Sequence, residues 1–106
     1  YSCGVGALRA NAGKSNVAAA KAGLIECTKT AAVEVARRGV TSNAVAPGWI
    51  ETEMTAGVSD DLLKAVPARR AGKPEEVAAF VTWLCSPENS YISGQNIAID
   101  GGFTRV

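Results

Sequence analysis

The side-chain types in this 106-residue sequence restrict the acid–base and nucleophilic chemistry that it could perform. Histidine is absent, which excludes Ser-His-Asp and Cys-His catalysis. The three cysteines, Cys3, Cys27 and Cys85, form no Cys-x-x-Cys pair, and without histidine a zinc site would need carboxylates. We therefore predict no metal site, and interpret the cysteines as small buried hydrophobic residues in a reducing, cytoplasmic compartment.

One candidate for chemistry is Lys21, in a stretch rich in alanine that is typical of a helix. Val17 lies four residues earlier and therefore on the same helical face, but valine has no proton to give. From the helix alone, Lys21 is better interpreted as a surface lysine with its stem along apolar neighbours. Val17 is then an ordinary core residue.

A second candidate is the polar loop that begins at Pro47-Gly48 and extends to Gly57. It directly follows the run from Val40 to Ala46, which we interpret as a strand. Open α/β sheets bind ligands beyond the carboxyl ends of their strands, so this loop is a possible binding site. A plain turn after a strand is the alternative.

Composition and charge exclude several classes of function. Lysine and arginine number 11 and acidic residues 10, so the net charge is +1 and gives no reason to expect nucleic acid or an anionic membrane. No apolar run reaches 18 residues, and no signal peptide is visible, so we expect no membrane association. Because the sequence begins Tyr1-Ser2-Cys3, we interpret it as a fragment of a longer protein.

The elements that must position these candidates begin with a long helix. After a loop at residues 4–16, with Ser15 or Asn16 as cap, the pattern predicts a helix from Ser15 to Arg38, ended by Gly39. Its apolar face follows a period of three and four residues. That face consists of Val17, Ala20, Leu24, Cys27, Thr28, Ala31 and Val35.

The rest of the chain predicts helices between two strands. Ser59 can cap a short helix from Asp60 to Val66. A last helix starts at Pro74 and ends before Pro87, with an apolar stripe of Val77, Phe80, Val81, Leu84 and Cys85. The segment 95–99 alternates like a strand. Two short strands with a long crossover indicate parallel pairing and a right-handed connection, hence the C-terminal portion of a doubly wound α/β domain.

Four motifs in this order resemble those of the short-chain dehydrogenase/reductase family, most closely the 3-oxoacyl-acyl-carrier-protein reductases. They are Asn11-Ala12-Gly13-Lys14-Ser15-Asn16 with Lys21-Ala22-Gly23-Leu24, then Asn43-Ala44-Val45-Ala46-Pro47-Gly48-Trp49-Ile50-Glu51-Thr52, then Gly72-Lys73-Pro74-Glu75-Glu76-Val77-Ala78, and finally Tyr91-Ile92-Ser93-Gly94-Gln95 with Asp100-Gly101-Gly102. The resemblance implies that residues 1–106 are the C-terminal part of a single NAD(P)-binding Rossmann-type domain. The half that carries the Gly-rich dinucleotide loop is absent.

The resemblance also implies a site. Lys21 matches the family's active-site lysine, which hydrogen-bonds the cofactor ribose and lowers the pKa of a tyrosine one turn away. Val17 occupies the position of that tyrosine, and Gly4 the position of the serine that orients the substrate carbonyl. Ser2 is two residues out of register with that serine.

The Pro47-Gly48 loop matches the family pattern in full. The resemblance implies that the backbone at Ile50 holds the nicotinamide carboxamide and that the Thr52 hydroxyl faces the pyrophosphate. The resemblance implies NADP or NAD as the cofactor, with NADPH favoured. The residues that decide between NADH and NADPH lie upstream, so this sequence does not separate them.

Partners follow from the same resemblance. A basic residue at Arg38 would help to receive an acidic acyl carrier protein, although a solvated helix end explains Arg38 equally well. Tyr91 fits packing or a subunit contact. The long helix and the last strand pair between subunits in the family, which implies a homo-oligomer.

Two functional hypotheses are open. In the first, the chain belongs to an NAD(P)H-dependent reductase of a 3-oxoacyl thioester or a similar ketone, small or carrier-bound, with catalysis impaired because Val17 replaces the acid and Gly4 the serine. In the second, it is a degenerate, non-catalytic relative that serves in assembly or binds NAD(P).

Overall fold

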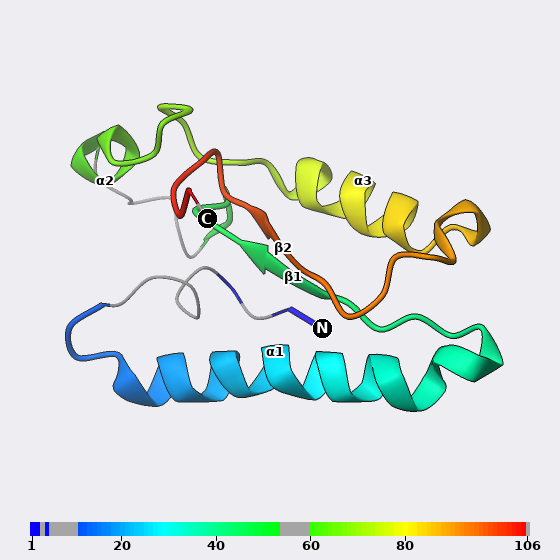
Figure 1. Cartoon of the computed structure of the whole chain (residues 1–106). Coiled ribbons are helices and arrows are strands. Elements are labelled where there is room, and N and C mark those ends of the chain that lie inside the picture. The colour runs from blue at the N-terminus through cyan, green and yellow to red at the C-terminus, as the bar shows by residue number, and fades with distance from the viewer. Residues whose placement is uncertain (3, 5–10, 54–59, 106) are drawn as a thin grey trace.

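The computed structural model describes residues 1, 2, 4, 11–53 and 60–105, which form an α/β arrangement (Figure 1). The elements are α1 (Ser15–Val35), η2 (Ala36–Arg38), β1 (Ala44–Pro47), α2 (Asp60–Lys64), α3 (Pro74–Leu84), η4 (Pro87–Asn89) and β2 (Asn96–Ile99). The predicted α/β class and the order of these elements are confirmed.

The long helix α1 begins and ends close to the predicted positions, but its cap differs. Lys14 is the N-cap residue and makes no side-chain cap bond, so neither Ser15 nor Asn16 caps the helix as predicted. At the other end the helix tightens into η2, and Gly39 has the left-handed φ of 73° that the sequence predicted there.

The face of α1 that contacts the strands is displaced from the predicted stripe. Thr28 and Ala32 are buried, and Leu24 and Ile25 pack against Ala44 and Ala46 of β1. Val17 and Cys27 are exposed, so the prediction that they are core residues was wrong. Alanines at positions 44 and 46 of β1 let the helix approach closely, and the rotation of α1 then follows from which of its side chains fit there.

The two strands pair in parallel, as predicted, with Ala44 opposite Asn96 and Pro47 opposite Ile99. The first residues of the chain lie along the other edge of β1, through a parallel bridge from Ser2 to Val45. The amide of Val45 donates to the Tyr1 carbonyl at 2.8 Å. β1 therefore lies between two parallel neighbours, and their carboxyl ends share one edge.

Strand β1 is shorter than the predicted run from Val40 to Ala46 and starts at Ala44. The residues before it bond to the loop that precedes β2 instead. The amide of Gly94 donates to the Ser42 carbonyl at 2.7 Å, and the Asn43 side chain donates to the Ile92 carbonyl at 2.9 Å. These bonds fix the amino ends of both strands, which gives the Tyr91 to Gln95 motif a structural role.

The second and third helices confirm the start signals read from the sequence. α2 begins at Asp60 and is two residues shorter than predicted, while Ser59 lies outside the described residues. α3 begins at Pro74 behind Lys73, and Val77, Phe80 and Leu84 are at least half-buried. Val81 and Cys85 are exposed, so the predicted stripe is narrower in the structure.

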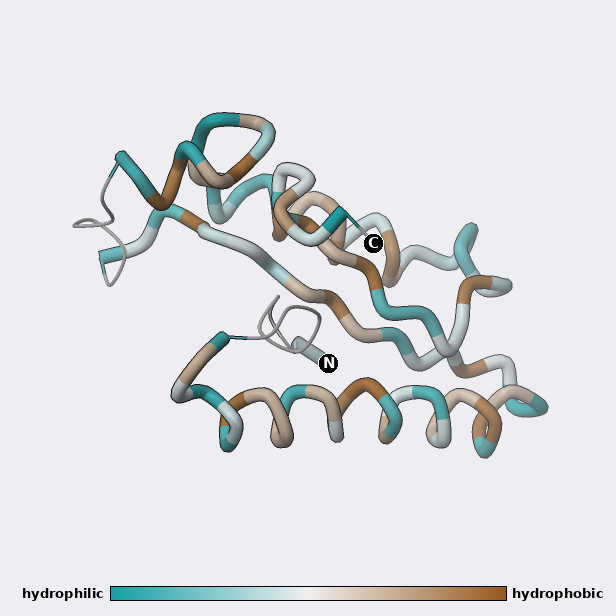
Figure 2. Tube along the Cα trace, turned by 60° about the vertical axis from the view of Figure 1, so that its left-hand side comes forward, coloured by the Kyte–Doolittle hydropathy of each residue, from teal (hydrophilic) through white to brown (hydrophobic). Residues whose placement is uncertain are grey.

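The helices α1 and α3 lie on opposite sides of the two strands, and the turned view agrees (Figure 1, Figure 2). The core between these layers is small: Ala32, Ala44, Val45, Ala46, Val66 and Leu84 are the buried hydrophobic residues among those described. This layering places the first turns of α1 beneath the carboxyl ends of the strands, where β1 points (Figure 1).

Candidate functional site

Three segments meet at the carboxyl edge of the sheet. Gly4 follows the strand-like start of the chain, and a Cβ added to it would lie 4.0 Å from the Pro47 carbonyl oxygen. Pro47 ends β1, and Asp100 follows β2. The structure thus brings together Gly4 and the Pro47 to Thr52 loop, two of the three parts of the predicted site, with Asp100 as a third neighbour.

The loop leaves the sheet through a close approach at Gly48. Its amide donates to the Ile99 carbonyl at 2.9 Å, which continues the parallel ladder by one bond. A Cβ at Gly48 would lie 2.8 Å from the Asp100 Cβ and 2.9 Å from its Cα. Because such distances are far below van der Waals contact, only glycine fits here without a shift of the backbone.

Asp100 is in turn fixed by its own hydrogen bonds. Its carboxylate accepts from the amide of Gly102 at 2.9 Å, from the amide of Thr104 at 2.8 Å and from the Thr104 hydroxyl at 2.6 Å. Partial burial raises the pKa of Asp100, but the hydrogen bonds from Thr104 and Gly102 outweigh it and leave the pKa below its ordinary value. The turn beside Gly48 therefore carries a charged Asp100 carboxylate that three hydrogen bonds hold in place.

Beyond Gly48, the loop pairs with Gly72. The Gly72 amide donates to the Trp49 carbonyl and the Glu51 amide donates to the Gly72 carbonyl, both at 2.8 Å, which forms a parallel bridge between Ile50 and Gly72. The backbone around Ile50 is thus held from the side of α3. The Thr52 side chain stays exposed.

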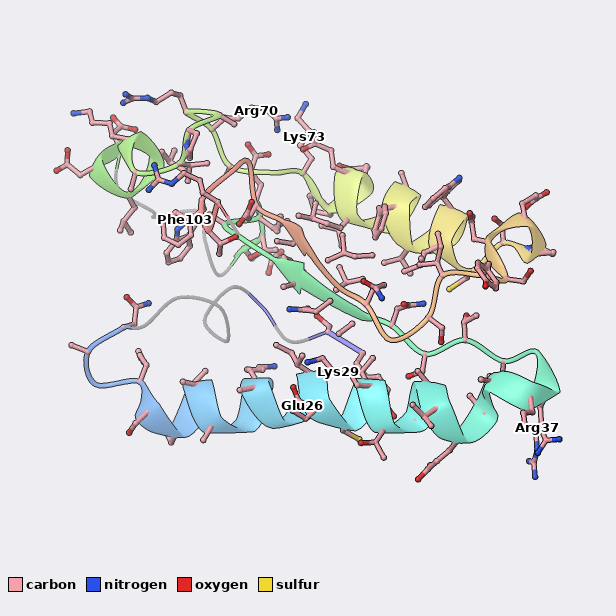
Figure 3. All side chains as sticks on the ribbon, viewed as in Figure 1. Glu26, Lys29, Arg37, Arg70, Lys73 and Phe103 are labelled. Atoms are coloured by element: carbon pink, nitrogen blue, oxygen red, sulfur yellow. The ribbon has the colours of Figure 1, made fainter. Side chains whose placement is uncertain are left out.

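The segment before α3 carries an exposed, bidentate ion pair. Arg70 donates to both carboxylate oxygens of Glu76, at 2.7 and 2.8 Å, and the Lys73 amide donates to Glu76 at 2.8 Å. These hydrogen bonds lower the pKa of Glu76 to about 2, and those from Arg70 have the largest effect. Figure 3 shows Arg70 and Lys73 at the start of α3.

A cavity of about 90 Å³ lies between the loop and this segment. Its lining includes Trp49, Ile50, Arg70, Glu76 and Asp100. The Trp49 indole nitrogen is buried and has no hydrogen-bond partner among the described residues. Sequence reasoning gave no role to Arg70, Gly72 or Glu76, although the Gly72-to-Ala78 motif contained the last two.

Lys21 and Val17 lie on the first turns of α1. Lys21 is half-buried, one turn before the Leu24 and Ile25 pair that packs on β1, and so lies toward the carboxyl edge. No residue in the described part of the chain pairs with its ammonium group. Val17 is 42% exposed.

The residues present fit a nicotinamide cofactor at this edge. The loop from Pro47 to Thr52 is held by Ile99 and Gly72, so its backbone is preformed. The exposed Thr52 side chain and the Lys21 ammonium are polar groups of the kind that bind ribose and phosphate oxygens. A pyrophosphate-binding glycine loop of the dinucleotide type does not occur among the described residues.

A second, larger hollow of about 530 Å³ lies on the α3 side of β1. It is largely apolar and does not include Lys21. Its lining consists of Tyr1, Ser2, Thr41, Ser42, Asn43, Val45, Pro47, Val77, Val81, Leu84 and Cys85.

The remaining candidates lie away from the carboxyl edge. Arg38 is exposed at the far end of α1, about 25 Å along the helix axis from Lys21, and its neighbour Arg37 marks this end in Figure 3. Tyr91 is fully exposed, so packing within the described chain does not explain it. Cys27 and Cys85 are exposed, contrary to the prediction that the cysteines are buried, while Cys3 lies outside the described residues.

The described residues contain neither a metal-binding cluster nor a membrane-spanning helix. Within residues 1, 2, 4, 11–53 and 60–105, no cluster of three or more His, Cys, Asp or Glu side chains could hold a metal ion. No helix in that part of the chain has the length and apolar character needed to cross a membrane.

The sequence profile of a family described as Enoyl-(Acyl carrier protein) reductase matches residues 3–104. The 3-oxoacyl-[acyl-carrier-protein] reductase FabG of Vibrio harveyi is 53% identical over 100 residues, which are 91% of this chain and 41% of that protein. The protein of the same description from Escherichia coli (strain K12) is 50% identical over 100 residues, with the same coverage.

Solved structures of short-chain dehydrogenases are also similar to this chain. A short-chain dehydrogenase/reductase variant from Serratia marcescens superposes with a TM-score of 0.91 at 37% identity, over 97% of this chain and 44% of that one. A short-chain dehydrogenase from Bacillus anthracis gives a TM-score of 0.87 at 42% identity, over 96% of this chain and 42% of that one. The chain thus spans about two fifths of the length of the proteins it matches.

Proposed function

The chain belongs to the short-chain dehydrogenase/reductase family, and we propose that its residues form the C-terminal, cofactor-facing part of an NAD(P)H-dependent reductase. The substrate class is a 3-oxoacyl thioester or a similar ketone, and NADPH is the favoured cofactor. The observation that carries this proposal is the meeting of Gly4 and the Pro47 to Thr52 loop at one carboxyl edge, with the first turns of α1 beneath it.

The loop and Lys21 bind and orient the cofactor, which supplies the hydride when bound. The backbone at Ile50 holds the nicotinamide carboxamide, and the Thr52 hydroxyl faces the pyrophosphate. Lys21 donates hydrogen bonds to the ribose. The bonds from Gly72 to Trp49 and Glu51 support these roles, because they fix the loop before any ligand arrives.

Proton transfer is the step that the chain cannot perform with the residues of the family pattern. Val17 has no proton to give, and Gly4 has no hydroxyl group to orient a carbonyl. The loss of a general acid typically costs ~10²–10⁴ in rate. We therefore expect cofactor binding with little ketone reduction.

A second candidate function follows from that deficit: a non-catalytic relative that serves in assembly or binds NAD(P). The resemblance implies a homo-oligomer, and the side chains of Val33 and Tyr91 are exposed and available for a subunit contact. An acyl carrier protein could still approach Arg38, which lies far from the reacting atoms, so such a contact would affect delivery of the substrate only.

NADPH binding by the intact protein tests the proposal, with cofactor fluorescence as the signal. We expect binding at micromolar concentrations and a weaker Kd for Lys21→Met, because the ribose loses its charged donor. Lys29→Met is the matched control, since Lys29 lies on the same helix and pairs only with Glu26, at 2.7 Å, among the described residues.

The result can contradict each part separately. An intact protein that binds no NADPH or NADH at high micromolar concentrations would refute both the reductase and the cofactor-binding alternative. Binding that Lys21→Met and Lys29→Met weaken equally would refute the role of Lys21.

A further inference from the structure

Glu76 lies at the junction of three contacts before α3. Its carboxylate receives two hydrogen bonds from Arg70, at 2.7 and 2.8 Å, and one from the Lys73 amide, at 2.8 Å. Arg70 also donates to the Ala71 carbonyl at 3.1 Å. One carboxylate thus fixes the backbone between Arg70 and Lys73 relative to the helix.

The fixed backbone includes Gly72, which is the partner of the cofactor-facing loop. Gly72 bonds to the residues on both sides of Ile50, at 2.8 Å each. A Cβ at Gly72 would lie 2.8 Å from the Ile50 Cδ1 and 3.7 Å from a Glu76 carboxylate oxygen. The loop, the glycine and the carboxylate are therefore successive neighbours.

We propose that Glu76 is a positioning residue, which with Arg70 holds Gly72 against Ile50 and so keeps the Pro47 to Thr52 loop in its cofactor-facing shape. The inference rests on the proposed function, because it assigns the loop to the cofactor. The Glu76 carboxylate itself contacts no reacting group in this arrangement. Its effect reaches the ligand through the backbone of Gly72.

The Arg70–Glu76 pair has a directional geometry, which suits it to hold the backbone in one position. A planar guanidinium bound to both oxygens of a carboxylate is directional, which a single point charge is not. The N-terminal cap of α3 does not require a charged side chain, because capping boxes contain either glutamate or glutamine at this position. Glu76→Gln therefore keeps the size and the cap oxygen, and removes the charge and one of the two acceptors for Arg70.

Amide hydrogen exchange is the first test, on wild type, Glu76→Gln and the matched control Glu75→Gln. Glu75 precedes Glu76 in the same first turn of α3 and is exposed. We expect exchange at the Glu51 and Gly72 amides to be roughly threefold faster in Glu76→Gln, and unchanged in Glu75→Gln. The Trp49 indole NMR signal should move in Glu76→Gln only, while that of exposed Trp83 stays constant.

Either of two exchange results would overturn the inference. Unchanged rates at Glu51 and Gly72 would mean that the ion pair does not hold the bridge. The same acceleration at the Ala44 amide, which bonds to the Gln95 carbonyl at 2.8 Å at the opposite end of β1, would mean a general loss of stability.

NADPH titration is the second test, and it separates this inference from the proposed function. We expect the Kd of Glu76→Gln to rise roughly threefold over that of Glu75→Gln. Equal Kd values would overturn the inference, since a positioned loop must affect its ligand. If wild type binds no NADPH, the proposed function fails, and the exchange rates still decide whether Glu76 positions the loop.

Discussion

Val17 stands near the start of α1 with 42% of its surface exposed, one turn before the half-buried Lys21. An exposed valine contributes little to a core, so packing does not explain its presence at the position of the family's acid. The same exposure leaves room for a larger side chain. At the residue scale, valine therefore gives the proposed site no proton donor at this position.

Gly4 is the second departure, and its backbone makes a simple repair costly. Its φ is 72°, in the left-handed region that side chains with a Cβ disfavour. We expect Gly4→Ser to destabilise the protein by about 1–2 kcal/mol. The comparison is with Gly4→Asn, since asparagine tolerates this conformation better than serine.

Thermal unfolding of both variants measures the difference. Gly4→Asn should retain more stability than Gly4→Ser. Equal melting temperatures for the two would show that backbone strain at Gly4 is not what separates them.

At the scale of the elements, the site depends on close approaches between segments distant in sequence. Leu24 and Ile25 of α1 meet the alanines of β1, and Gly48 meets Asp100 after β2. The sequence indicated the helix ends, through Gly39 and Pro74, because these signals act locally. It did not indicate which side of α1 faces β1, because that depends on the shape of a partner in another element.

Two glycines test this distinction. Gly48→Ala should lose about 1–3 kcal/mol of stability, because its Cβ would lie 2.8 Å from that of Asp100. Gly23→Ala should gain up to about 1 kcal/mol, because Gly23 is inside α1 and no atom lies within 4 Å of an added Cβ. Urea unfolding of both variants gives the two signs, and a stabilised Gly48→Ala would contradict the close approach.

The Arg70–Glu76 pair should make stability depend on pH in the acid range. Hydrogen bonds from Arg70 and the Lys73 amide lower the pKa of Glu76 from 4.5 to about 2 in the folded chain. As the pH falls, Glu76 is therefore protonated in the unfolded chain before it is protonated in the folded chain. The contribution is complete above pH 4.5 and is lost as the pH falls toward 2.

Melting temperatures of wild type and Glu76→Gln across this range measure the effect. Wild type should melt at a higher temperature than Glu76→Gln at pH 7. This difference in melting temperature should disappear near pH 2, where protonated glutamate resembles glutamine. The other carboxylates cancel in this comparison. A difference that persists unchanged at pH 2 would contradict the assigned pKa.

At the scale of the whole molecule, the chain matches 41% of the length of the Vibrio harveyi relative, so that relative is more than twice as long. The motifs predicted the family, the parallel sheet and the placement of the Pro47 loop at the carboxyl edge, because each motif keeps its spacing from the strand beside it. Arg70 escaped prediction, since nothing in the sequence indicates that it reaches Glu76 across the start of α3. One cavity joins the predicted loop to the unpredicted ion pair, because Ile50, Arg70 and Glu76 all line it.

Ketone reduction by Val17→Tyr tests most directly the claim that the cofactor-facing frame persists and only proton transfer is lost. NADPH oxidation with a 3-oxoacyl thioester should be measured for the intact protein, for Val17→Tyr, with and without Gly4→Ser, and for Val33→Tyr as an exposed control on the same helix. We predict that turnover rises about 10²-fold or more for Val17→Tyr variants and stays at the wild-type level for Val33→Tyr. Bound NADPH with no increase in either Val17→Tyr variant would contradict the assignment of Val17 to the position of the missing acid.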